Sequence, residues 1–149
     1  MTAQDAFEIH SLRDHLEALA SRLAAEHIDD AGRQRLSGAM SALVTAVRRE
    51  GRSEIVHADM NLHDVIVELS GHRRLREMYA GIRDRSLLFM NLTEHFHPDQ
   101  EEIITMHESL VGAIACGDPE RAEEHAIVHD TTDGETLRRL LGTVEGEQP

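Results

Sequence analysis

The residues best suited to chemistry in this sequence are a carboxylate and an imidazole that share a helix face with apolar residues. Asp59 and His63 lie four positions apart in the segment DMNLH, so both side chains would point the same way on a helix. Ile55 and Ile66 belong to the same stripe, which directs the acid and the imidazole toward the core. Because a buried carboxylate without a partner is costly, either a hydrogen bond or a metal ion should compensate it.

Two more histidines take inward positions later in the chain. His107 replaces an apolar residue in the stripe that includes Ile103 and Leu110, and His129 continues the stripe that includes Ala126. Histidine is the commonest protein metal ligand, and this chain has 11 of them. Three predicted helices therefore each direct a side chain capable of binding metal toward the core.

The segment Gly117–Pro119 should bring two of these helices together. A glycine to end one helix, Asp118 to cap the next and a proline in its first turn predict a tight antiparallel connection. His107 lies about ten residues before this turn and His129 about ten after it, so both should return to the same level of a bundle. The sequence thus predicts a single metal site with the ligands Asp59, His63, His107 and His129.

Structural interpretations compete with this one. A single inward histidine is more often a hydrogen-bonded core residue than a ligand. His125 is the main rival as a ligand, since it also pairs with His129 four positions on. The segment HFH at 95–97 could chelate from a loop, but a polar connector is the simpler interpretation. We interpret the remaining histidines as surface or interhelix residues: His10, His15, His27, His57 and His72.

The elements that must position these residues are helices. Apolar spacing predicts an all-α antiparallel bundle of about six helices, starting near residues 5, 30, 53, 72, 98 and 119. In the first helix the predicted stripe comprises Ile9, Leu12, Leu16, Leu19 and Leu23, and in the fourth it comprises Leu75, Met78, Ile82 and Phe89. We predict one domain over residues 1–141, followed by a disordered tail over 142–149.

Composition limits the partners. The 149 residues suit one domain, and 15 Lys and Arg against 28 Asp and Glu give a formal net charge of -13, which disfavours direct nucleic acid binding by this chain. The single Cys116 excludes an internal disulfide. The sequence has no long apolar run and no leader, so we expect a soluble, cytoplasmic protein that does not enter a membrane.

Three segments resemble blocks of the FCD domain, the C-terminal effector-binding domain of FadR-branch GntR transcriptional regulators. They are LRDHLEALASRLAA, DMNLHDVIVELSGHRRL and HESLVGAIACGDPERAEEHAIVH, and the resemblance covers residues 7 to about 130. The last block is the most specific. Leu62 stands where the family usually has Phe and His72 where it usually has Asn, but neither departure removes a ligand.

The resemblance implies the same ligand set. Metal-binding members use the Asp and His of the second block and the two histidines that bracket the last, which correspond to Asp59, His63, His107 and His129. It also implies a homodimer formed through this domain. Family members normally carry a basic winged helix-turn-helix on the N-terminal side of the FCD domain. We therefore expect either an excised domain or a protein without its own DNA-binding domain.

Two classes of function follow. As a sensor, the domain would hold one divalent transition metal ion per chain, with Zn or Ni favoured and Mn or Fe compatible, and a small carboxylate effector would occupy open coordination positions. Arg85 could bind a second effector oxygen, or it could form an ordinary salt bridge. The alternative is a stand-alone metalloenzyme acting on a small carboxylate or carbonyl, although no separate general base is evident. A metal-free interaction domain is the third possibility.

Overall fold

The structure is a computed structural model that describes residues 2–49, 51–92 and 99–129. Its helices are α1 (Ala3–His27), α2 (Asp30–Arg49), α3 (Arg52–Leu69), α4 (Arg73–Leu92), α5 (Gln100–Ala115) and a last helix over residues 119–129. The described part of the chain therefore contains six helices and no strand, which confirms the all-α prediction. The HFH segment and the predicted tail lie outside the described residues.

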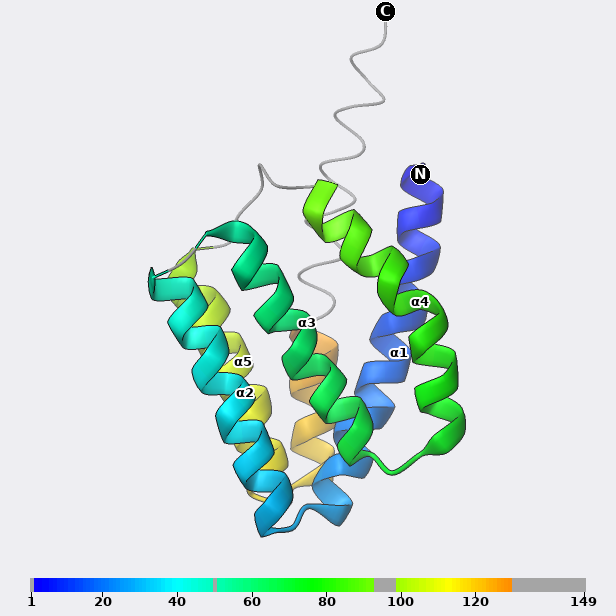
Figure 1. Cartoon of the computed structure of the whole chain (residues 1–149). Coiled ribbons are helices and arrows are strands. Elements are labelled where there is room, and N and C mark those ends of the chain that lie inside the picture. The colour runs from blue at the N-terminus through cyan, green and yellow to red at the C-terminus, as the bar shows by residue number, and fades with distance from the viewer. Residues whose placement is uncertain (1, 50, 93–98, 130–149) are drawn as a thin grey trace, which may run out of the picture.

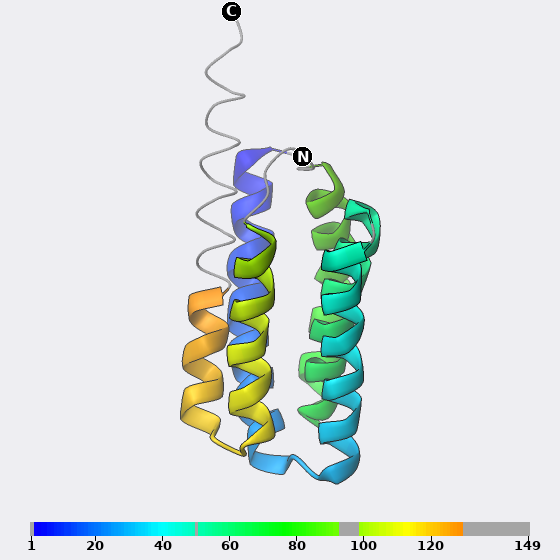
Figure 2. The same cartoon turned by 90° about the vertical axis from the view of Figure 1, so that its left-hand side faces the viewer.

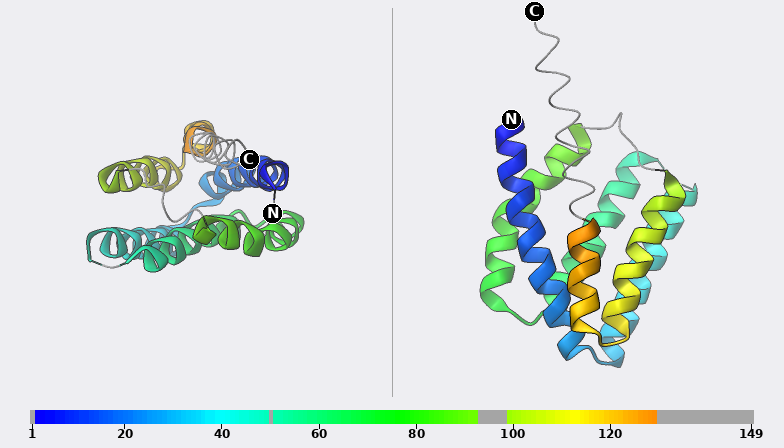
Figure 3. Two further views of the ribbon diagram at one scale, coloured as in Figure 1. Left: turned by 90° about the horizontal axis from the view of Figure 1, so that it is seen from above. Right: turned by 180° about the vertical axis from the view of Figure 1, so that it is seen from behind.

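The helices run alternately up and down and form two layers. Figure 1 shows α1 descending, α2 ascending and so on along the chain. In Figure 2, α2, α3 and α4 form one layer, and α1, α5 and the last helix form the other. The view from above in Figure 3 shows the same division, with the last helix beside α1 and α5. Short turns join α1 to α2, α3 to α4 and α5 to the last helix, as an antiparallel bundle requires.

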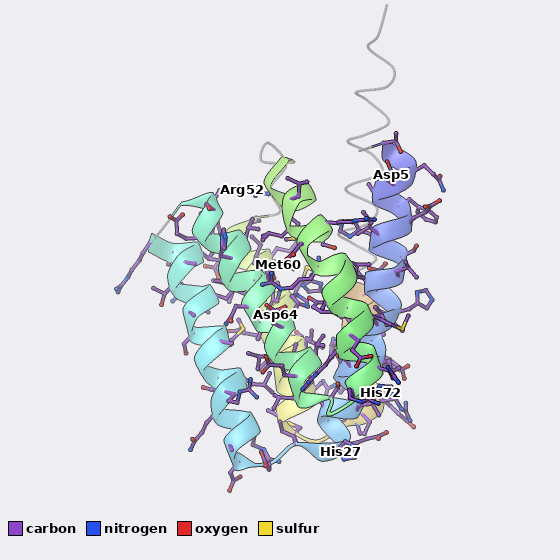
Figure 4. The ribbon with its side chains drawn as sticks, turned by 45° about the vertical axis from the view of Figure 1, so that its right-hand side comes forward. Asp5, His27, Arg52, Met60, Asp64 and His72 are labelled. Carbon is purple, nitrogen blue, oxygen red and sulfur yellow. The ribbon has the colours of Figure 1, made fainter. Side chains whose placement is uncertain are left out.

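The apolar core lies between the layers. Its fully buried members include Leu36 and Leu43 of α2, Leu62 and Ile66 of α3, and Leu110 and Ile114 of α5. Figure 4 shows side chains filling the space between the layers, with Met60 and Asp64 marking the middle of α3. None of the helices in the described ranges is long and apolar enough to span a membrane.

The predicted inward stripe of α1 is confirmed only in part, since Ile9 is buried and Leu16 packs against the core, but two of its leucines are exposed. Leu12 and Leu19 are 53% and 40% exposed, whereas alanines such as Ala20 and Ala24 are fully buried. Because α1 contacts α3, α4 and α5, small side chains on its inner face let three neighbours approach closely. Leu12 and Leu19 are left at the side of the helix.

A similar correction applies to α4. Met78, assigned to the inward stripe, is 60% exposed, while the next residue, Tyr79, is buried. The inward face of the helix therefore runs through Leu75, Tyr79 and Ser86, to one side of the predicted stripe. Leu75 remains buried, as predicted.

Candidate metal centre

The structure brings the four predicted ligand residues together inside the bundle. Asp59 and His63 come from α3, His107 from α5 and His129 from the last helix, and all four side chains are buried. Each offers one ligand atom, and these atoms lie within 4.8 Å of one another. Since α3 belongs to one layer and the other two helices to the second, the group joins both layers.

One carboxylate oxygen lies near the centre of the group. Asp59 Oδ1 is 2.6 Å from Nε2 of His107 and 3.4 Å from Nε2 of His63. Nε2 of His129 is 2.9 Å from Nε2 of His107. Two imidazole nitrogens cannot face each other at this distance with both lone pairs free, so a proton or a cation must lie between them.

The outward nitrogens of two of the rings already have acceptors. Nδ1 of His107 lies 2.7 Å from the carbonyl oxygen of Ile103, one turn earlier on α5. Nδ1 of His63 lies 2.7 Å from Oε2 of Glu17, which α1 supplies. When Nδ1 of each ring donates, the Nε2 lone pairs are left for the centre, as in the usual arrangement of histidines that bind metal.

A buried ion pair on α1 contacts His63 through its carboxylate. Nε of Arg13 donates to Oε1 of Glu17 at 2.7 Å, and both side chains are buried. Burial alone would raise the pKa of Glu17, but Arg13 and His63 outweigh it and hold the pKa below its usual range. The hydroxyl of Tyr79 is buried near the same carboxylate, and burial followed by the charge of Glu17 raises its pKa.

Charges within the group itself reinforce one another. Burial disfavours the ionised form of Asp59, but His107 and His63 hold its pKa well below the usual range. Burial likewise disfavours the charged form of His63, but Glu17 and Asp59 raise its pKa well above the usual value. Without a metal, the centre thus favours a positive charge next to the two carboxylates.

The turn between α5 and the last helix sets the level of His107 and His129 in the bundle. Gly117 adopts a φ of +70°, and its N–H donates to the carbonyl of Ile114 while the N–H of Asp118 donates to that of Ala113. This is the Schellman pattern that ends a helix with a left-handed glycine. The Asp118 carboxylate then accepts from the N–H of Arg121, which caps the next helix.

Comparison with known families agrees with this architecture. The sequence profile of the FCD domain matches residues 8–132, most of the chain. The chain belongs to the FCD domain family. Its donor set of three imidazole nitrogens and one carboxylate oxygen fits a divalent transition metal ion, so this FCD domain could hold one.

Relatives of this FCD domain are described as transcriptional regulators. It is 24% identical over 142 residues to the uncharacterized HTH-type transcriptional regulator YdhC of Bacillus subtilis (strain 168), covering 95% of this chain and 63% of the relative, so it spans less than two thirds of that protein.

Solved structures show the same fold. Escherichia coli McbR/YncC superimposes with a TM-score of 0.79 at 21% identity, over 89% of this chain and 67% of that one. Streptococcus agalactiae GntR superimposes with a TM-score of 0.75 at 19% identity, over 87% of this chain and 58% of that one. The metal-free FCD domain of TM0439 superimposes with a TM-score of 0.74 at 21% identity, over 96% of this chain and 98% of that one.

Other predicted residues of the FCD domain lie elsewhere. Arg85, predicted to bind the effector, is exposed on α4. The structure therefore does not place it at the buried centre. His125 is partly exposed and does not belong to the group of four.

Sequence reasoning missed Arg13 and Glu17. Both lie inside the first block of the FCD resemblance, and their spacing of four residues places them on one helix face. That face also carries His10 and is distinct from the leucine stripe. A buried face rich in polar residues was the available signal.

Proposed function

We propose that this chain is the metal-dependent effector-binding domain of a GntR-type transcriptional regulator, with Asp59, His63, His107 and His129 as ligands of one divalent ion. The observation that carries the proposal is the convergence of four buried ligand atoms within 4.8 Å. The outward contacts of His63 Nδ1 with Glu17 and of His107 Nδ1 with Ile103 support it, because they leave the inward nitrogens for the ion. Zn or Ni suits such a site best.

Charge balance favours an anionic effector. Among the buried residues that the structure describes, the permanently charged ones are Arg13, Glu17 and Asp59. Ligand histidines must be neutral to bind metal. A divalent ion and Arg13 then supply three positive charges against two negative ones, which leaves one unbalanced positive charge in a buried site. A carboxylate bound to the ion would neutralise it.

The position of the ion suggests how binding is transmitted. Its proposed ligands come from α3 in one layer and from α5 and the last helix in the other. An effector that completes the coordination shell would favour one packing of the two layers over another. In a complete regulator this change in packing would be transmitted to the DNA-binding domain, most simply through a homodimer.

Calorimetry with small carboxylic acids tests this function. The Zn-loaded protein should bind at least one member of a panel of mono-, di- and tricarboxylates, and the chelator-treated protein should bind none of them. The matched controls are the uncharged amides of the same acids, which should bind far more weakly. Equal binding with and without metal, or equal binding of acid and amide, would contradict the proposal.

A further inference from the structure

Glu17 occupies an unusual position for a residue outside the ligand group. It lies on α1, which supplies no ligand, yet its buried carboxylate reaches the ring of His63 on α3. Its other oxygen accepts from Arg13. One oxygen of the carboxylate is therefore bound by Arg13, and the other contacts His63, a proposed ligand.

The outward nitrogens of His107 and His63 contact oxygens from different sources. His107 uses the carbonyl of Ile103 on its own helix, so α5 alone fixes the orientation of that ring. The acceptor for Nδ1 of His63 comes from a different helix. Which nitrogen of a histidine carries the proton is set by such a partner. The orientation and tautomer of His63 therefore depend on α1.

We infer that Glu17 is a positioning residue of the proposed metal site, holding His63 with its proton on Nδ1 and its Nε2 toward the ion, and that Arg13 keeps the Glu17 carboxylate in place. This inference rests on the proposed function. It makes α1 part of the metal centre, so that displacement of α1 would weaken metal binding and loss of the metal would loosen the contact of α1 with α3.

A matched pair of variants of the 149-residue chain isolates the hydrogen bond. Both carry Arg13→Met, which removes the buried cation, and one carries Glu17→Gln while the other carries Glu17→Met. The two have the same net charge and similar side-chain volumes, but only Gln can accept from His63. Replacing a buried ion pair with neutral groups of similar size is often tolerated, so both should fold.

Zn affinity, measured by competition with a chelator, should be about tenfold or more weaker in the Met variant than in the Gln variant. Nitrogen NMR of the Zn-loaded proteins should find the His63 proton on Nδ1 in the wild type and the Gln variant. The control is Leu36→Ala, which opens a cavity in the core beside α2. It should lower the free energy of unfolding without changing Zn affinity.

Equal Zn affinity in the Met and Gln variants would overturn the inference while leaving the proposed function intact. So would a loss of affinity in Leu36→Ala as large as that in the Met variant, because the effect would then follow general stability. Failure of the wild type to bind Zn, Ni, Mn or Fe would overturn the proposed function and the inference together.

Discussion

Asp59 Oδ1 lies within 3.4 Å of nitrogens from two different helices, so a single oxygen links α3 to α5 at the centre of the bundle. Without a metal this is a close contact between a buried carboxylate and two imidazoles. In the proposed site the same oxygen would be a ligand of the ion.

Single substitutions should separate ligands from neighbours. Changing His63, His107, His129 or Asp59 to Ala should lower Zn affinity by at least about tenfold, or 1.4 kcal/mol, because each vacancy can be filled only by water. His125→Ala is the matched control on the last helix and should leave the affinity unchanged. Loss of Zn in His125→Ala but not in His129→Ala would show that this helix is rotated from the described orientation.

The depressed pKa of Glu17 predicts acid sensitivity of the metal-free protein. A carboxylate whose pKa is lower in the folded state stabilises the fold above its unfolded-state pKa, about 4.3, and this contribution is lost as the pH falls through the folded-state value. Below about pH 4.3 the free energy of unfolding should therefore decrease more steeply with falling pH in the wild type than in Arg13→Met/Glu17→Gln. Urea unfolding in the presence of chelator at a series of pH values measures how the free energy of unfolding of each protein changes with pH. Equal changes in the two proteins would contradict a lowered pKa of Glu17.

The convergence of the four proposed ligands could be predicted because polar residues at inward helical positions stand out against an apolar stripe. His107, between Ile103 and Leu110, is the plainest case. Arg13 and Glu17 could not be found in the same way. The leucines of α1 suggested a different inward face, and only tertiary packing placed the polar face inside.

At the scale of the elements, turns set the level at which side chains meet. The left-handed Gly117 ends α5 so that the chain reverses at once and His129 returns to the level of His107. The glycine, aspartate and proline of this turn made the connection predictable. The rotations of α1 and α4 about their own axes were not, since apolar residues lie on more than one side of each helix.

Two glycine substitutions should have opposite effects on stability. Gly117→Ala should lower the free energy of unfolding by about 1 kcal/mol, because a side chain disfavours the left-handed backbone. Gly38→Ala, in the exposed interior of α2 with nothing within 4 Å of the added carbon, should raise it by about 0.5–1 kcal/mol. Denaturant unfolding of both variants checks this, and a stabilising Gly117→Ala would contradict the described turn.

At the scale of the molecule, the two layers meet at the proposed ion, while a leucine face of α1 remains uncovered. Leu12 and Leu19 are seven residues apart, so they share one side of the helix, and both are exposed in the single chain. Exposed apolar residues that share a face suit an interface. They support the expectation of a homodimer.

Sedimentation should therefore find the wild type at twice the chain mass of 16.7 kDa. Leu12→Glu/Leu19→Glu should sediment as a monomer, because burying these carboxylates in an interface is costly. Zn affinity should be unchanged, since neither leucine belongs to the buried ligand group. A wild-type monomer, or a double variant that remains dimeric, would exclude this face as the interface.

The X-ray absorption spectrum of the Zn-loaded chain at the zinc edge tests the central claim most directly. Because the proposed ligands are three imidazoles and one carboxylate, the spectrum should contain the multiple scattering of three histidine rings and a first shell of nitrogen and oxygen at about 2.0–2.2 Å, with one zinc retained per chain. Failure to retain zinc after dialysis, or a spectrum with one imidazole or none, would contradict the assignment of Asp59, His63, His107 and His129 as a metal centre.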